Sequence, residues 1–125
     1  MSHISKIELE VKDLGTLRQA CNRLGLNMIE AQKTFKWYGQ EDGSSDHAIQ
    51  VPGATYEIGV VKTGNAFELR CDYWDSAIGK AIGQNGGLLK QAYAVERTKT
   101  EARRKGYSII EKKTDSGIQL NVRVT

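Results

Sequence analysis

The stretch GGLLKQAYAVER (residues 86–97) opens the part of the chain that decides the fold class. Its apolar side chains recur at the spacing of one helix face, so the sequence predicts a helix from Leu88 to Lys105. Gly106 follows, and glycine is the residue type that ends a helix in the left-handed conformation. Beyond the first turns only Ala102 is apolar, so we expect the last two turns to project over the surface. The positions predicted to be buried are Leu88, Leu89, Ala92, Tyr93 and Val95.

The pattern of a β-hairpin follows this helix. The segments from Tyr107 to Lys113 and from Ile118 to Val124 flank the turn sequence Asp115-Ser116-Gly117. In the second segment apolar side chains alternate with polar ones, which is typical of a strand with one protected face. The end of the chain therefore predicts a long helix followed by a C-terminal β-hairpin.

The beginning of the chain predicts a strand that leads into a second helix. From Ile4 to Val11 apolar and charged side chains alternate over most of the stretch, which indicates a half-buried strand. Asp13 is a residue type that caps a helix N-terminus, and Gly25 is suited to the stop. Apolar residues between them lie at helical spacing, at Leu14, Leu17, Ala20, Cys21 and Leu24.

The middle of the chain predicts short strands separated by turns. A strand from Asn27 to Phe35 is the best interpretation of that segment, and the polar residues 40–46 predict an exposed loop. The remaining predicted elements are a short strand at His47–Val51, an antiparallel hairpin at Thr55–Val61 and Ala66–Tyr73, and a short helix from Asp75 or Ser76 to Ile82.

Length and composition indicate one soluble domain. The chain has 125 residues, 39% hydrophobic and 26% charged, so we expect residues 1–125 to form a single α+β domain. The predicted architecture is an antiparallel-rich sheet with two principal helices on one face. The net charge of +3 permits an acidic partner without requiring one. Because neither a membrane-length apolar run nor a signal-peptide pattern is found, we expect a cytoplasmic protein that does not contact membranes.

Cations on the long helix are the main candidate binding residues. Lys90, Arg97 and Arg104 are spaced seven residues apart, so they share one side of the helix. Such a line of cations would contact the phosphates of a nucleic acid or of a phosphorylated ligand. Glu96 and Glu101 interleave with it, as they would on an ordinary soluble surface. The full candidate set is Lys90, Arg97, Lys99, Arg103, Arg104 and Lys105.

Two further pairs of residues are candidates for binding. Trp37 and Tyr38 could stack on the bases of a single-stranded nucleic acid, or they could pack under the following loop or against a protein partner. Gly86 and Gly87 precede the helix, where free amides can bind a phosphate or another anion. The alternative for the glycines is a turn without a ligand.

Metal, thiol and catalytic chemistry have few candidates. A histidine at position 3 can bind Cu(II) or Ni(II) together with the terminal amine, but His3 could equally hydrogen-bond to nearby backbone. We expect no zinc site, because neither His3 nor His47 has a partner at ligand spacing. Cys21 and Cys71 are expected to be buried structural thiols, with a disulfide or a reactive thiol as the alternatives. No catalytic signature or cofactor motif occurs, so we expect neither a cofactor nor an enzyme.

Short motifs spread along the chain resemble a known family. The sequence is similar to the conserved hypothetical chloroplast reading frame thirty-five family, which occurs in algal plastids, cyanobacteria, other bacteria and some phages. The resemblance covers both ends and, more loosely, residues 26–70. It implies a cytoplasmic location, the plastid stroma or the cytoplasm of a phage-infected host, and it leaves the function open. The motifs are Met1-Ser2-His3-Ile4-Ser5-Lys6-Ile7, Lys12-Asp13-Leu14, Gly86-Gly87-Leu88-Leu89, Tyr93-Ala94-Val95 and Ala102-Arg103-Arg104-Lys105-Gly106-Tyr107.

Two functional hypotheses follow from these observations. In the first, the protein is a non-enzymatic adaptor or regulatory domain that binds another protein through its sheet face or its long helix. In the second, the basic helix Leu88–Lys105 binds nucleic acid or a phosphorylated ligand.

Overall fold

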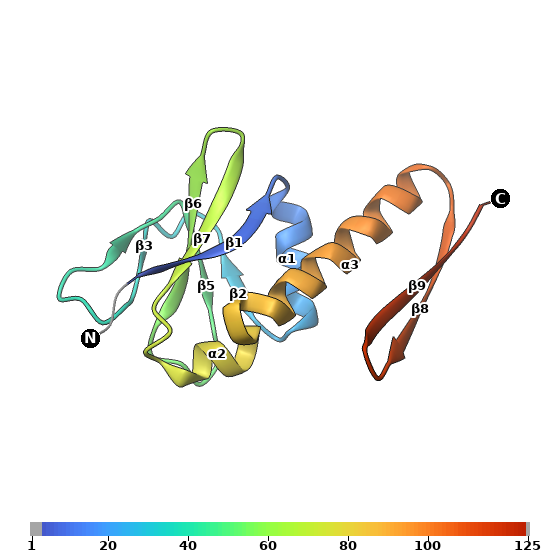
Figure 1. Cartoon of the computed structure of the whole chain (residues 1–125). Coiled ribbons are helices and arrows are strands. Elements are labelled where there is room, and N and C mark those ends of the chain that lie inside the picture. The colour runs from blue at the N-terminus through green and yellow to red at the C-terminus, as the bar shows by residue number, and fades with distance from the viewer. Residues whose placement is uncertain (1–3, 125) are drawn as a thin grey trace.

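The computed structural model describes residues 4–124 and has an α+β fold (Figure 1). The predicted fold class, its two principal helices and its C-terminal hairpin are confirmed. His3, the predicted copper or nickel ligand, lies outside the described residues. In chain order the elements are β1 (Ser5–Val11), α1 (Leu14–Arg23), β2 (Asn27–Ile29), β3 (Thr34–Phe35), β4 (Gly43–Ser44), β5 (His47–Gln50), β6 (Glu57–Thr63), β7 (Ala66–Cys71), α2 (Ser76–Ile82), the 3-10 turn η1 (Gln84–Gly86), α3 (Gly87–Arg104), β8 (Ser108–Thr114) and β9 (Gly117–Arg123).

The main sheet and the helices enclose one hydrophobic core. The strand order is β1-β7-β6-β5-β2, and neighbouring strands are antiparallel. Ile7 pairs with Leu69, which pairs with Val60, so these three buried residues share the inner face of the sheet. Leu17 of α1 and Leu89 of α3 belong to the same core and are fully buried. The helices therefore cover the inner face, and α1 packs against α3.

The local signals at the helix ends act as predicted. The side chain of Asp13 accepts hydrogen bonds from the amide of Gly15 and the hydroxyl of Thr16, at 3.0 and 2.8 Å. Gly25 has a φ of +73° just after α1. Asp75 caps α2 through a 3.0 Å bond from the amide of Ala77.

The outer face of the main sheet is partly covered by the segment that contains β3 and β4. Phe35 is only 1% exposed, and its ring lies on Gly59 in the centre of β6. A Cβ at position 59 would lie 2.4 Å from Cδ1 of Phe35, so the ring needs glycine there. The predicted single strand from Asn27 to Phe35 is wrong, because Ala31 has a φ of 63° and separates β2 from β3. The predicted loop 40–46 also contains the short strand β4.

A tight turn positions the start of α3 against β1. Gly86 has a φ of +73°, and a Cβ there would lie 2.8 Å from Cγ2 of Ile7. Leu89, Ala92, Tyr93 and Val95 are buried as predicted. Leu88 is not, since 45% of it is exposed. Its place on the helix faces the open groove beside the hairpin tip, rather than the core.

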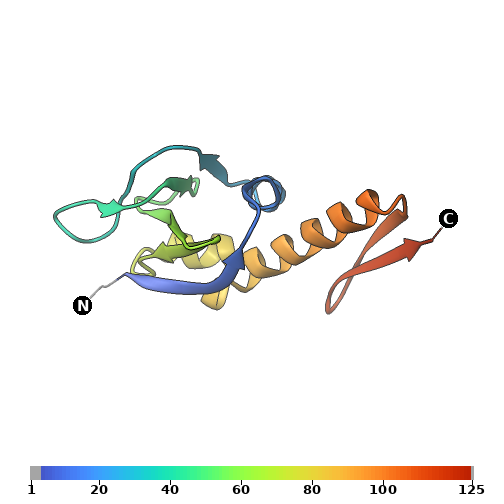
Figure 2. The same ribbon diagram turned by 90° about the horizontal axis from the view of Figure 1, so that it is seen from above.

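The C-terminal hairpin is separate from the main sheet. β8 and β9 pair with each other from Ser108 and Arg123 to Thr114 and Gly117, without a register shift. They lie beyond α3, at the end of the molecule opposite the main sheet (Figures 1 and 2). α3 therefore lies between the five-stranded main sheet and the two-stranded hairpin.

Alanine substitutions at the paired glycines should separate backbone strain from helix propensity. Gly86→Ala is expected to lower the free energy of unfolding by about 1–2 kcal/mol or more, because the residue is left-handed and its Cβ would clash with Ile7. Gly87→Ala is the matched control, since its φ is −58° and a Cβ there meets no atom within 4 Å. It should raise the free energy of unfolding by about 0.4–1 kcal/mol. Urea denaturation measures both, and equal effects would contradict this interpretation.

Candidate functional site

The predicted cations of α3 do not act as one uniform surface. Nζ of Lys99 lies 3.3 Å from Glu111 and 3.7 Å from Glu96, and Arg104 lies 3.2 Å from Glu101. These two cations are therefore occupied. Of the predicted cations, Lys90, Arg97, Arg103 and Lys105 make no ion pair with any other residue of 4–124.

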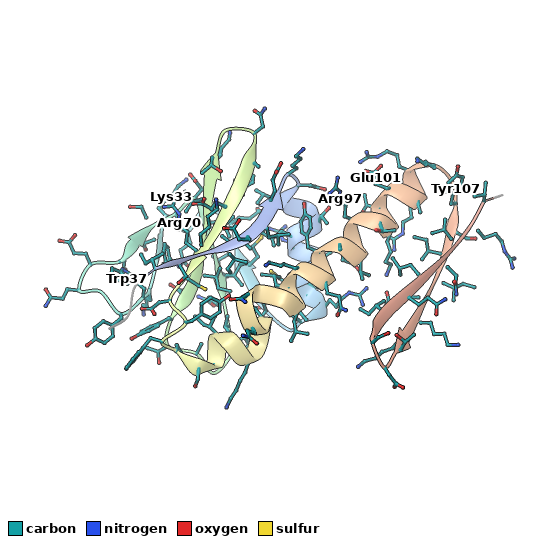
Figure 3. The ribbon with its side chains drawn as sticks, in the orientation of Figure 1. Lys33, Trp37, Arg70, Arg97, Glu101 and Tyr107 are labelled. Carbon is teal, nitrogen blue, oxygen red and sulfur yellow. The ribbon has the colours of Figure 1, made fainter. Side chains whose placement is uncertain are left out.

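Carboxylates surround the middle of the predicted basic side. Arg97 and Glu101 lie close together on one side of α3 (Figure 3). A groove of about 490 Å³ runs between this part of α3 and the residues that join β1 to α1. Its lining combines three cations with three acids: Lys12, Arg97, Arg104, Glu10, Asp13 and Glu101. A phosphate entering this groove would meet acids as well as cations, which disfavours tight anion binding here.

The two glycines proposed for anion binding use their amides within the turn. The amide of Gly86 donates to the carbonyl of Gly83 at 3.0 Å, and that of Gly87 donates to the carbonyl of Gln84. This is the geometry of the alternative interpretation, a turn without a ligand, which the close packing of Gly86 on Ile7 requires. The anion site stays a prediction.

A partly buried ion network attaches the hairpin to the body of the protein. The guanidinium of Arg23, at the end of α1, donates to both carboxylate oxygens of Glu111 and to Glu96, each at 2.7 Å. Lys99 completes the network. Hydrogen bonds from Arg23, with a smaller contribution from Lys99, lower the pKa of Glu111 to about 2. One charged cluster thus joins α1, α3 and β8.

An exposed pair of aromatic rings lies at the other end of the molecule. Tyr38 and Trp74 are each 63% exposed, and their ring centroids lie 6.2 Å apart in an edge-to-face arrangement. The carboxylate of Asp72 lies beneath them and is 1% exposed. It accepts the amide of Tyr38 at 3.1 Å and that of Trp74 at 2.9 Å. The buried carboxylate of Asp72 therefore fixes the backbone of both aromatic residues.

Two further aromatic residues, Trp37 and Tyr56, lie near this aromatic pair. Trp37 packs under the following loop, where its ring lies against Gly39 and its Nε1 donates to the carbonyl of Glu41 at 2.8 Å. This packing is one of the alternatives predicted for Trp37. Partial burial, followed by the nearby charges of Asp72 and Tyr38, raises the pKa of Tyr56, which places a third aromatic ring near the pair.

Trp74 was not among the candidate residues predicted from the sequence. The only local signal is that Asp72 and Asp75 flank it, and both carboxylates accept backbone amides, as structural acids do. Burial alone would raise the pKa of Asp75, but the amides of Tyr56, Ala77 and Thr55 hold it below its ordinary value. The contact with Tyr38 joins residues 36 positions apart, so only the folded chain brings the rings together.

The remaining reactive groups have structural roles. Cys21 and Cys71 are buried free thiols as predicted, and burial raises the pKa of each to about 12. Nδ1 of His47 accepts the amide of Ala31 at 2.9 Å. Within the part of the chain that the structure describes, no three His, Cys, Asp or Glu side chains gather as metal ligands would.

The uncovered part of the outer sheet face is polar. Glu68 lies at its centre and binds Lys6 and Arg70, at 3.1 and 2.6 Å. These three charged side chains form ion pairs with one another and offer no apolar anchor for a partner. The aromatic pair is therefore a stronger candidate for protein binding than the sheet face.

Comparison with known proteins identifies one family. The sequence matches the family described as "Protein of unknown function (DUF1257)" over residues 20–122. Searches of curated proteins and of solved structures gave no match. None of the helices within residues 4–124 is long and apolar enough to span a membrane.

Acid should loosen the hairpin through Glu111. The pKa of this group falls from 4.5 to about 2 on folding, so its stabilising effect is complete above pH 4.5 and is lost as the pH falls through 2. We expect amide-exchange protection of β8 and β9 to fall over this window before that of the main sheet. Glu111→Gln should show weak hairpin protection already at pH 6.

Glu101→Gln is the matched control for this experiment, because Glu101 is an exposed acid on α3 that pairs with Arg104 alone. The amide-exchange protection of β8 and β9 in this variant should depend on pH as it does in the unmodified protein. Strong hairpin protection in Glu111→Gln at pH 6 would show that the ion network does not attach the hairpin.

Proposed function

We propose that this chain, which belongs to the DUF1257 family of proteins of unknown function, is a non-enzymatic adaptor or regulatory domain that binds another protein through Tyr38 and Trp74. The observation that carries this proposal is the contact of two large, mostly exposed aromatic rings above a buried carboxylate. Tyrosine and tryptophan are the side chains most enriched among residues that dominate binding energy at protein interfaces.

The hydrogen bonds of Asp72 beneath the two rings favour a binding role for them. Asp72 fixes the backbone of both residues, so less conformational entropy remains to be lost when a partner covers the rings. Each ring still has most of its area available for burial. A rigid apolar anchor with polar neighbours is the usual centre of a protein interface.

The alternative function is binding of nucleic acid or of a phosphorylated ligand through the helix Leu88–Lys105. The unpaired cations Arg103 and Lys105 at the end of α3 favour it. The carboxylates beside Arg97 weaken it in the middle of the helix.

The finer family assignment and the compartment are also part of this proposal. The chain would be a member of the chloroplast reading frame thirty-five family and would act in the cytoplasm, the plastid stroma or a phage-infected host cell. The motifs at both ends of the sequence support this assignment, and the DUF1257 match over residues 20–122 is compatible with it.

Removing the two rings should abolish partner binding without unfolding the protein. The double variant Tyr38→Ala, Trp74→Ala is expected to lose about 2 kcal/mol of binding free energy per ring, or roughly a thousandfold in affinity together. Proteins captured from the native host by the unmodified chain should be missing with the variant, and titration calorimetry with the purified partner would give the affinities.

Leu88→Ala is the control for this test, because Leu88 is also a large exposed apolar residue but belongs to the groove beside the hairpin tip. It should retain the captured partner. Equal capture by the unmodified chain and the double variant would rule out the aromatic pair as the binding site.

A further inference from the structure

The C-terminal hairpin has one polar face that is mostly exposed in the described chain, and only its tip, at Thr114 and Gly117, lies beside α3. The register of β8 and β9 places seven side chains and one glycine on this outer face, and within the strands it contains no acidic residue. Gln119 donates to Asn121 at 3.3 Å, which confirms that these two share the face. The outer face consists of Ser108, Ile110, Lys112, Thr114, Gly117, Gln119, Asn121 and Arg123.

The opposite face of the hairpin is directed at the helices. Glu111 lies on it and binds Arg23 and Lys99. Three of its apolar residues, Ile109, Ile118 and Leu120, are half-buried and the fourth, Val122, is 44% exposed. On the outer face, Lys112, Gln119 and Asn121 are exposed. The attachment to α1 and α3 therefore leaves the outer face open to solvent, at the end of the molecule (Figure 2).

Positive charge is concentrated in the part of the chain that forms α3 and this hairpin. Residues 87–124 contain nine Lys and Arg against four Asp and Glu, while residues 1–86 contain nine against eleven. Two of the four acids, Glu96 and Glu111, are neutralised by Arg23 and Lys99. The net positive potential of the protein thus originates at the hairpin end, where an anionic partner would be attracted.

We propose that the outer face of the hairpin binds duplex DNA in the major groove. This groove is about 12 Å wide and admits a two-stranded β-ribbon. Two paired strands lie about 4.8 Å apart, and seven residues extend about 23 Å. Both edges of the β8–β9 ribbon are free of other strands within the described chain, so its width is that of two strands alone.

The residue types on the outer face match the chemistry of base edges and phosphates. Glutamine and asparagine, as at 119 and 121, form paired hydrogen bonds with adenine, and arginine, as at 123, does so with guanine. Ile110 is 63% exposed in the centre of this polar face, where an apolar side chain can contact a thymine methyl group. Lys112 at one side of the ribbon would contact the phosphate backbone.

The end of α3 would add contacts outside the groove. Arg103 and Lys105 make no ion pair within the described residues and precede Ser108, whose cross-strand partner is Arg123. They are placed to reach phosphates that flank the ribbon. Duplex RNA is disfavoured as the ligand, because its major groove is too deep and narrow for a ribbon.

The test is a fluorescence-anisotropy titration of the full chain with a labelled duplex of about 20 base pairs, roughly two helical turns. We expect binding at about 50 mM salt that weakens by more than tenfold at about 200 mM. The double variant Lys112→Glu, Arg123→Glu should weaken binding about tenfold or more and reduce the dependence on salt. Amide chemical shifts should change on addition of the duplex in β8 and β9.

Two matched variants distinguish DNA binding by the outer face from an effect of net charge and from binding by α3. Lys33→Glu, Lys36→Glu makes the same change of charge at exposed residues far from the hairpin and should bind nearly as well as the unmodified chain. Lys90→Glu, Arg97→Glu tests the middle of α3 and should have little effect. Circular dichroism checks that each variant is folded.

Several outcomes would overturn this inference. These are the absence of duplex binding at low salt, equal weakening by the Lys33 and Lys36 variant, loss with the Lys90 and Arg97 variant alone, or tighter binding of single strands or duplex RNA. An acidic protein captured by the hairpin in place of DNA would also overturn it. None of these results bears on the proposal for Tyr38 and Trp74, because the two tests use different residues and ligands.

Discussion

The placement of the C-terminal hairpin depends on one guanidinium group. Arg23 binds Glu96 and Glu111 at 2.7 Å and thereby joins α1, α3 and β8. A two-stranded hairpin has little stability alone in water, so β8 and β9 need this attachment to hold a fixed orientation. Glu96 is only 7% exposed, and a carboxylate at that depth requires a cationic partner. The same ionic cluster therefore satisfies a buried charge and positions the outer face of the hairpin.

Local sequence signals predicted the elements well, whereas contacts between distant segments decided the rest. The cap at Asp13, the stop at Gly25 and the alternation in β1 each depend on neighbouring residues, and each was confirmed. The break at Ala31 was missed because alanine rarely adopts a positive φ. That break allows Phe35 to reach Gly59 on the outer face of the main sheet, a contact between residues 24 positions apart.

The candidate site was harder to predict than the fold for the same reason. The cations of α3 and its own acids Glu96 and Glu101 are visible in the sequence, but two further acids come from distant segments, Glu10 from β1 and Glu111 from β8. These contacts turn part of a binding stripe into a structural network. The local sequence around Trp74 does not show its partner, because Tyr38 lies in a distant loop. Trp37 packs as one of its predicted alternatives, through a bond to a residue only four positions later.

The positions of the two proposed surfaces are compatible with the action of an adaptor. Trp37, beside the aromatic pair, and Tyr107, at the base of the hairpin, lie at opposite ends of the molecule (Figure 3). α3 runs from the body that carries the main sheet to the hairpin over 18 residues, or about 27 Å. Its start is fixed by the packing of Gly86 on Ile7, and its middle is fixed by the Arg23 network through Glu96 and Lys99. A ligand bound at one end would leave the surface at the other end free, because the two surfaces lie at opposite ends. Since both attachments hold α3 in place, the two surfaces keep a fixed orientation relative to each other.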